Sequence, residues 1–174
     1  SKIKIAFQGE KGAYSHIACE EIYKDAEIKN CTTFEETFKI AFEDENVKAI
    51  IPLENSLAGR VADIHYLLPK YKLQIYGEHF QKVEHCLLSK QEAALKDIKY
   101  VRSHAQAIGQ CQNIIKKNNF KSIISADTAG SAKDLKENKD KSIAAIASEL
   151  AAKIYGLKIL EKNIEDETGN VTRF

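Results

Sequence analysis

Short apolar runs rich in β-branched residues alternate along this chain with longer stretches in which apolar residues recur at helical spacing. The short runs predict five β-strands: Ile3 to Phe7, Ala49 to Leu53, Tyr100 to Ser103, Ser122 to Ser125 and Ile143 to Ala147. The longer stretches predict amphipathic helices, among them Ile17 to Tyr23, Phe34 to Phe42 and Ala107 to Ile115. Strands that alternate with helices of this size predict an α/β fold, with helices on both faces of largely parallel sheets.

The stretch Leu73 to Leu88 interrupts this alternation, because it has no clear helical period and Gly77 is its one strong breaker. A βαβαβ set precedes it and a second such set follows, so we interpret it as a crossover between two lobes with a cleft between them. Lobe I is predicted to comprise residues 1–78 and 159–174, because Leu157 to Ile164 would return to it. Lobe II is then predicted to comprise residues 79–158.

Composition excludes several classes of function. The 174 residues are 44% hydrophobic, which is enough to bury a core. Lys and Arg number 26 and Asp and Glu 25, so the formal net charge of +1 gives no strong field for nucleic acid, and an anionic substrate must be held locally. No run approaches the roughly 18 apolar residues that span a bilayer, and the start lacks an apolar signal core. We therefore expect no membrane association and a cytoplasmic protein.

The four cysteines give no sign of a metal site or of disulfide bonds. Cys19, Cys31, Cys86 and Cys111 lie far apart in the sequence and form no CxxC pair. Zinc sites and the disulfide frameworks of small secreted domains both use closely spaced cysteines. Four reduced, mostly buried thiols and no bound metal are therefore expected.

Polar residues follow the first two predicted strands. The segment from Gly9 to Ser15 opens a helix, so its N–H groups and the Ser15 hydroxyl could hold an anion, or Ser15 could simply cap the helix. After the second strand come Asn55 and Ser56, followed by Gly59, in a place where open α/β sheets bind ligands. These residues could bind a ligand or form an Asx turn and a helix cap.

Two similar helix starts follow later strands. Ser103 is a candidate N-cap, and Gln110 lies four residues after Gln106, so the two amides could share one helical face. His104 beside them is more typical of a structural residue. Thr128 follows Asp127, another candidate cap. Two capped helix N-termini that faced one cleft would suit a dianion.

These segments and the terminal Asn170-Val-Thr172-Arg173-Phe174 occur together and in one order. They resemble the motifs of the prephenate dehydratase catalytic domain, which are GxxGxYS, PxENSxxGxV, SHPQAxxQC, DTAxxA and NxTRF. The resemblance spans residues 3 to 174, and the terminal motif is its most specific part. Where the family usually has proline in SHPQ, this chain has Ala105, which removes no reacting group.

The resemblance implies a fold similar to type II periplasmic binding proteins and a catalytic role for Thr172. Residues implied to line the same cleft are Asn55, Ser103 and Gln110, and further substrate-binding candidates are Ser15, Ser56, Thr128, Arg173 and Phe174. Homodimers are usual in the family. Many members continue past this motif into a regulatory ACT domain, whereas this chain stops at Phe174, so no ACT domain is expected in it.

The implied reaction converts prephenate into phenylpyruvate, CO2 and water. Aromatisation drives this reaction, so no cofactor is expected. The Thr172 hydroxyl would assist departure of the leaving oxygen, through a strong hydrogen bond or a proton relay. Regular β-structure over residues 170–174 would put Thr172 and Phe174 on one face, while Arg173 braced the strand through an ion pair. Alternative functions are an arogenate dehydratase and a non-catalytic module that binds a small anion.

Overall fold

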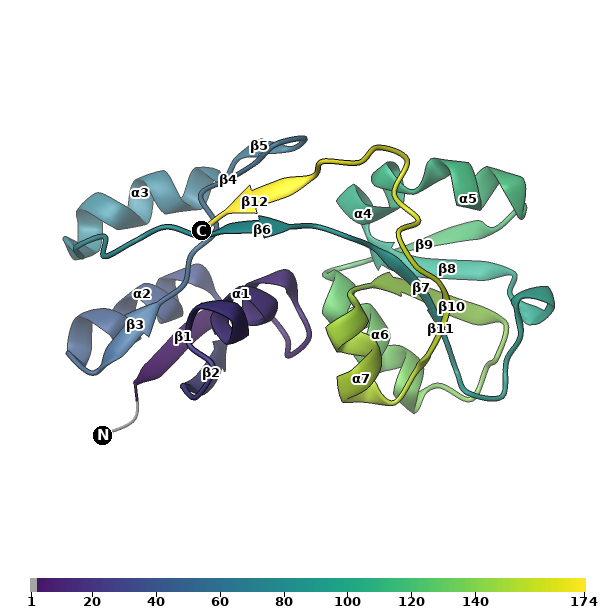
Figure 1. The fold of residues 1–174 in the computed structure, drawn as a ribbon, viewed down its shortest axis with the longest axis horizontal. Coiled ribbons are helices and arrows are strands. Elements are labelled where there is room, and N and C mark those ends of the chain that lie inside the picture. Colours follow the sequence, from purple (N-terminus) through teal and green to yellow (C-terminus); the bar gives the residue numbers. More distant parts are fainter. Residues whose placement is uncertain (1–2) are drawn as a thin grey trace. The chain divides into compact units, whose positions relative to one another are not determined.

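The structure, a computed structural model, describes residues 3–174, which form two compact units. Unit 1 comprises residues 3–10, Tyr14–Val83 and Gly169–Phe174, and unit 2 comprises Lys11–Ala13 and Glu84–Thr168. Each unit contains both helices and sheets (Figure 1), which confirms the predicted α/β class. Over residues 3–174, none of the helices combines the length and the apolar character that crossing a bilayer requires.

Unit 1 begins with a parallel sheet of three strands in the order β2-β1-β3. Its elements in chain order are β1 (Lys4–Gln8), α1 (Tyr14–Ile22), β2 (Glu27–Cys31), α2 (Phe34–Glu43) and β3 (Val47–Ala49). Ile5, Ala6 and Phe7 on the central strand are completely buried, which explains the apolar run that predicted it. Phe38 of α2 packs against residues of α3 (Ala62–Tyr71) and closes a second small core.

A small antiparallel sheet forms the rest of unit 1, in the order β5-β4-β12-β6. Its strands are β4 (Glu54–Asn55), β5 (Gly59–Arg60), β6 (Phe80–Lys82) and β12 (Val171–Arg173). Figure 1 shows the C-terminal strand β12 lying between β4 and β6. The prediction of largely parallel sheets was therefore wrong for this part of the chain, because strands of two or three residues are too short to show a period.

The strand predicted at Ala49 to Leu53 ends earlier than expected. Regular pairing with β1 stops at Ala49, although the Ile50 N–H still donates to the Ala6 carbonyl at 3.0 Å. Pro52 has no N–H to continue the ladder. The Leu53 N–H then donates to the Arg173 carbonyl at 2.8 Å, so the chain has passed from the parallel sheet to the antiparallel one.

Unit 2 contains a five-stranded sheet in the order β11-β7-β10-β8-β9. Its strands are β7 (Cys86–Ser89), β8 (Tyr100–His104), β9 (Lys121–Ser125), β10 (Ile143–Ala147) and β11 (Lys158–Glu161). The pairs β10–β8 and β8–β9 are parallel, and β7 runs antiparallel to both of its neighbours. The strands predicted at Tyr100, Ser122 and Ile143 are confirmed.

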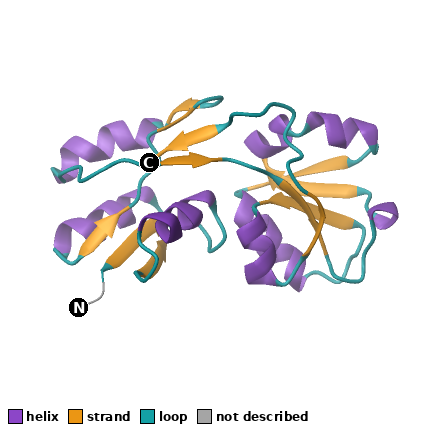
Figure 2. Ribbon diagram, in the orientation of Figure 1, coloured by secondary structure: helices purple, strands orange, loops and turns teal. Residues whose placement is uncertain are grey.

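Helices cover both faces of this sheet, as predicted (Figure 2). They are α4 (Ala105–Gln110), α5 (Gln112–Lys117), α6 (Thr128–Glu137) and α7 (Glu149–Tyr155), whereas the short 3-10 helix η1 (Leu95–Asp97) buries none of its residues. Ala144 and Ile146 of β10 pack in the core with α4 and α5, and Ala145 and Ala147 pack in the core with α6 and α7. Because β10 is buried on both faces, its sequence is continuously apolar rather than alternating.

The boundaries of the two units differ from those placed in the sequence. Apart from Lys11–Ala13, which belong to unit 2, the chain leaves unit 1 at Val83 and returns to it at Gly169, rather than at residues 78 and 159. The expected return over Leu157 to Ile164 was wrong, because β11 pairs with β7 inside unit 2. The helix predicted from Ala107 to Ile115 is also divided into α4 and α5, since Cys111 leaves the helical region with φ −124° and ψ 35°.

Candidate active site

Thr172 occupies the middle of β12 and is held by a strand on each side. Its register partners are Asn55 on β4 and Gln81 on β6. The side chain is half-buried. Pairing on both edges fixes the backbone of Thr172, so the direction of its hydroxyl depends on the side-chain contacts alone.

The side-chain amide of Asn55 supplies the contact that orients this hydroxyl. Its Nδ2 donates to Thr172 Oγ1 at 2.9 Å and to Asn170 Oδ1 at 2.7 Å. A hydroxyl oxygen that accepts a hydrogen bond keeps its own proton for donation to another group. The same N–H stabilises negative charge that develops on Oγ1, so Thr172 is arranged as a polarised hydrogen-bond donor.

The other end of the Asn55 side chain forms a turn. Its Oδ1 accepts from the backbone N–H groups of Leu57 at 3.0 Å and Ala58 at 2.9 Å, which is the Asx turn that the sequence suggested as one alternative. This turn leaves the amide nitrogen pointing to Thr172. Asn55 therefore forms the Asx turn and also donates a hydrogen bond to Thr172.

Ser56 and Asn170 join the loop after β4 to the start of β12. Ser56 Oγ accepts from the Val171 N–H at 2.9 Å and donates to the Gly169 carbonyl at 3.3 Å. Asn170 is 2% exposed, and its carbonyl accepts from the Val83 N–H at 2.8 Å. The Ser56 hydroxyl is thus engaged by the backbone of residues 169–171, and its contribution is to hold β12 in register.

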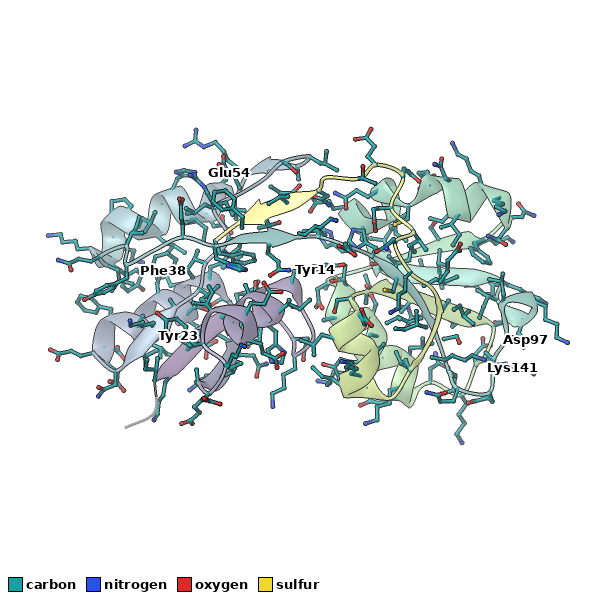
Figure 3. All side chains as sticks on the ribbon, in the orientation of Figure 1. Tyr14, Tyr23, Phe38, Glu54, Asp97 and Lys141 are labelled. Atoms are coloured by element: carbon teal, nitrogen blue, oxygen red, sulfur yellow. The ribbon has the colours of Figure 1, made fainter. Side chains whose placement is uncertain are left out.

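Arg173 forms the ion pair that strand geometry predicted. Its Nη2 lies 3.1 Å from Glu54 Oε1, and these two residues are direct cross-strand partners. Its Nη1 lies 3.8 Å from Glu78 Oε2, and Figure 3 shows Glu54 projecting from β4. Among the described residues, no hydrogen-bond acceptor reaches the buried Nε of Arg173. A partly exposed pair of this kind contributes little stability, about 0–1 kcal/mol.

Phe174 is buried and directly follows β12. Its N–H donates to the His79 carbonyl at 2.8 Å and its carbonyl accepts from the His79 N–H at 3.0 Å, which continues the register that pairs Arg173 with Phe80. The extended pairing therefore reaches Phe174, in agreement with the prediction that it lies on the same face as Thr172. Phe174 and Arg173 both line a hollow of about 1040 Å³ in unit 1, whose other walls include α2 and α3.

Ser15 lies elsewhere in unit 1. It is the second residue of α1 and is half-buried, so it is not the N-cap that the sequence offered as one alternative. Its backbone N–H is among the first four of the helix, which have no acceptor within the helix. This position is compatible with the other alternative, an anion held at the start of α1.

Three predicted site residues belong to unit 2, and Ser103 is the most buried of them. It is 0% exposed, and its Oγ donates to the Ile146 carbonyl at 2.7 Å. The N-cap of α4 is His104, whose Nδ1 accepts from the Gln106 N–H at 3.2 Å. The assignment of the cap to Ser103 was wrong, because β8 continues through His104 and keeps Ser103 within the sheet.

Thr128 is the first residue of α6, and Asp127 caps this helix. The Asp127 carboxylate accepts from the Gly130 N–H, as the sequence predicted. A carboxylate already occupies the end of the helix where an anionic ligand would bind. The geometry therefore favours a structural role for this motif.

Gln110, the last residue of α4, makes a contact that sequence analysis missed. Its Oε1 lies 2.8 Å from Nε2 of His85, a residue that is 2% exposed and directly precedes β7. His85 was not singled out, since it belongs to no predicted helix start and has no local period. The pair is separated by 25 positions in the sequence, so local patterns could not reveal it.

Asp166 organises the same region from a distant part of the chain. Its carboxylate accepts from the N–H groups of Gln112 at 2.9 Å and Asn113 at 2.8 Å, and its own N–H donates to the Gln110 carbonyl at 2.7 Å. These bonds satisfy the start of α5 and the end of α4. The division of the predicted helix at Cys111 is thus stabilised by residue 166.

Metal-binding and thiol chemistry find no support in the described chain. Over residues 3–174, the His, Cys, Asp and Glu side chains form no group of three or more that could hold a metal ion. Cys19, Cys31, Cys86 and Cys111 are free and buried, as expected. Burial raises the pKa of Cys19 and of Cys111 to about 12 and that of Cys86 to about 11, so these thiols stay protonated at neutral pH.

Burial of His85 should make stability depend on pH. Burial holds the pKa of His85 below its ordinary value of 6.5, against the opposing effects of the Gln110 hydrogen bond and the Glu165 charge. Below pH 6.5, His85 binds a proton in the unfolded chain but stays neutral in the folded chain until the pH reaches its lower folded pKa. The free energy of unfolding therefore falls as the pH drops from 6.5 towards the folded pKa. We expect His85→Leu to reduce this fall.

Urea unfolding at about pH 7.5 and about pH 5 measures the effect through the linkage between proton binding and folding. His65→Leu, at an exposed histidine of α3, is the matched control and should keep the wild-type difference between the two pH values. An equal fall in wild-type protein and His85→Leu would contradict the prediction.

Comparison with known proteins places this α/β chain among the dehydratases, a class of lyases. More particularly, a sequence model described as prephenate dehydratase matches residues 5–174, so the chain belongs to the prephenate dehydratase family.

Two curated relatives and one solved structure illustrate the similarity. A bifunctional N-acyl-homoserine lactone acylase/prephenate dehydratase of Komagataeibacter europaeus is 44% identical over 170 residues, which are 98% of this chain and 60% of the relative. Arogenate dehydratase/prephenate dehydratase 2 of Arabidopsis thaliana is 40% identical and covers all of this chain, which matches 46% of the relative. The prephenate dehydratase of Arthrobacter aurescens, solved in complex with L-Phe, superposes with a TM-score of 0.90 at 28% identity, covering 99% of this chain and 59% of that one. The chain spans about half the length of the curated relatives it matches.

Proposed function

We propose that this chain converts prephenate into phenylpyruvate, CO2 and water, with Thr172 as the catalytic residue. The observation that carries the proposal is the hydrogen bond from Asn55 Nδ2 to Thr172 Oγ1, at 2.9 Å, which leaves the threonine proton for donation. The order of the sequence motifs and membership of the family support the same reaction.

In the proposed step the bond between the ring and its carboxylate breaks, and CO2 leaves. The electron pair of that bond enters the ring and expels the hydroxyl at the opposite carbon, and the ring becomes aromatic. The departing oxygen gains negative charge, takes a proton and leaves as water. A hydrogen bond from the Thr172 hydroxyl stabilises this charge, and the Asn55 amide stabilises the charge that moves onto Oγ1.

Threonine is too weak an acid to release its proton outright at neutral pH. Thr172 can still assist the reaction through a strong hydrogen bond to the leaving oxygen, or through a proton relay that returns a proton to Oγ1. In either case the stabilisation must be greater in the transition state than in the bound substrate, so its loss lowers the turnover number rather than substrate affinity.

Prephenate is proposed as the preferred substrate over arogenate, which carries an amino group where prephenate has its keto oxygen. The named activities of the two relatives described above include prephenate dehydratase, and that of the Arabidopsis relative also includes arogenate dehydratase. The deciding experiment measures kcat/KM of the purified chain on each substrate, without added cofactor. An N-acyl-homoserine lactone is added as a third substrate, because the Komagataeibacter relative is also named as an acylase.

Phenylpyruvate formed from prephenate with the higher kcat/KM is the expected result. A higher value on arogenate would replace prephenate by arogenate in the proposal. Folded protein that converts neither substrate but binds prephenate in calorimetry would support the anion-binding alternative instead.

The proposed function predicts a large effect of Asn55→Asp. This isosteric change replaces the amide donor with an acceptor, so Thr172 Oγ1 loses its partner and meets a negative charge. Removing one such donor should lower kcat about 10²-fold. Steady-state kinetics on prephenate measures the change, and Asn46→Asp, at an exposed turn of unit 1, controls for the added charge. Equal kcat values for Asn55→Asp and wild-type protein would contradict the role of Asn55.

We also propose that the protein forms a homodimer and is located in the cytoplasm. Sedimentation equilibrium of the purified chain tests the first, and a mass of one chain at micromolar concentration would exclude the dimer. Fractionation of the source cells with an antibody against the chain tests the second.

A further inference from the structure

Within residues 3–174, the Thr172 hydroxyl accepts one hydrogen bond, from Asn55, and donates none. Gln81 flanks Thr172 on the side away from Asn55, as its register partner on β6. Residues directly opposite in an antiparallel pair project from the same face, with Cβ atoms roughly 5 Å apart. A glutamine side chain is long enough to cross that distance, so the Gln81 oxygen could accept the threonine proton.

Gln81 does not make this contact, because both ends of its amide are engaged along its own strand. Its Nε2 donates to the Lys82 carbonyl at 3.2 Å, and its Oε1 lies 3.1 Å from His79 Nε2. A backbone carbonyl only accepts, so the amide nitrogen must face Lys82 and the amide oxygen must face His79. The Gln81 oxygen is thus directed at His79 rather than at Thr172.

The position of the His79 ring is itself well defined. Its Nε2 also lies 3.1 Å from Oε2 of Glu21 on α1, and an ionised carboxylate and an amide oxygen only accept, so Nε2 must carry a proton. The backbone of His79 is paired with Phe174 through its N–H and its carbonyl. His79 lies two positions before Gln81 on the same strand face, so its N–H holds the amide oxygen along β6.

We propose that His79 is a positioning residue for the reaction, which holds the Gln81 amide so that its oxygen does not accept the Thr172 proton. This inference rests on the proposed function, in which the Thr172 hydroxyl must donate to the leaving oxygen. If Gln81 accepted that proton, this hydrogen bond would have to break before the hydroxyl could stabilise the transition state. The contact with His79 explains how a buried amide can lie beside Thr172 without competing for its proton.

Substitution of His79 by phenylalanine releases the Gln81 oxygen. The variant keeps an aromatic ring of similar size and removes the N–H, and a buried oxygen without a donor is costly, so it should turn to the Thr172 hydroxyl. We expect kcat on prephenate to fall about three- to tenfold, as the free energy of one hydrogen bond implies. The KM should change much less, because the competing contact opposes the transition state rather than substrate binding.

Steady-state kinetics measures both constants, and circular dichroism shows whether the variant is folded. His65→Phe, at an exposed histidine of α3, is the matched control and should keep the wild-type kcat. An unchanged kcat in folded His79→Phe would overturn the proposal.

Removal of the Gln81 amide tests whether the effect of His79 passes through it. Leucine at position 81 has a similar size and no acceptor, so it leaves nothing for His79 to hold away from Thr172. In the Gln81→Leu background, His79→Phe should therefore change kcat by less than about twofold. An equal fold loss from His79→Phe in both backgrounds would show a general structural role of the ring and overturn the proposal.

Two measurements that need no turnover keep this inference separate from the proposed function. A crystal structure of His79→Phe should show Gln81 Oε1 at hydrogen-bonding distance from Thr172 Oγ1, about 2.5–3.0 Å. Nitrogen-15 NMR of histidine-labelled wild-type protein should show His79 protonated on Nε2. An amide that keeps its wild-type orientation in the variant, or an unprotonated Nε2, would overturn the positioning role.

A different combination of results would count against the reaction instead. If both measurements gave the expected result and the wild-type chain converted no prephenate, the hydrogen-bond arrangement would stand. The proposed function would then be refuted, and with it the effect of His79 on that reaction.

Discussion

Thr172→Ala should lower the turnover number on prephenate about 10²–10³-fold, the usual cost of removing one preorganised donor from a transition state. The hydroxyl accepts from Asn55 at 2.9 Å, and the backbone of Thr172 is paired with a strand on each side, so the substitution removes a donor whose position is fixed. The KM should change much less, because the donated hydrogen bond strengthens as charge develops on the leaving oxygen. Steady-state kinetics of phenylpyruvate formation measures both constants.

Thr172→Ser is the matched control for this substitution. Serine keeps the hydroxyl and loses only a methyl group, so the Asn55 contact can persist and kcat should stay within about tenfold of wild type. Circular dichroism and thermal unfolding of both variants exclude a loss of fold as the cause. If Thr172→Ala turned over prephenate as fast as Thr172→Ser, the catalytic role of the hydroxyl would be refuted.

Gly12→Ala should destabilise the protein by about 2–4 kcal/mol, because two unfavourable effects coincide at this position. Gly12 has φ +94°, a conformation that strains any residue with a Cβ atom. A Cβ built there would lie 2.8 Å from the Cα of Ala151, which belongs to the backbone of α7 and cannot turn aside. The Gly12 carbonyl also accepts from Ser148 Oγ at 2.5 Å, so moving the segment would break a buried hydrogen bond.

Urea unfolding of Gly12→Ala beside Gly156→Ala separates the clash from the strain. Gly156 has φ +65° at the end of α7, but an added Cβ meets no atom of the described chain within 4 Å. Gly156→Ala should therefore cost only the conformational strain, about 1–2 kcal/mol. An equal loss of unfolding free energy in the two variants would contradict the prediction, because it would mean that the contact between the added Cβ and Ala151 costs no stability.

The sequence by itself determined the regular parts of the fold. The strand over Ile143 to Ala147 was predicted with its observed bounds, because a strand buried on both faces is apolar at every position. The helix from Phe34 was predicted from its apolar period, and Thr33 Oγ1 caps it by accepting from the Glu36 N–H at 3.0 Å. The motifs and their order also indicated the family, since each motif is a local string of residues.

Tertiary structure alone decided which of these residues meet. Asn55 and Thr172 are 117 positions apart, and the strands that join them have two and three residues, too few to show a period. The contact of His85 with Gln110 also joins distant segments, so sequence analysis missed it. Lys11–Ala13 likewise belong to unit 2 through a distant contact, in which the Tyr155 hydroxyl donates to the Lys11 carbonyl at 2.7 Å. Local patterns record which face of an element is buried, whereas pairing between distant segments depends on the packing of the whole unit.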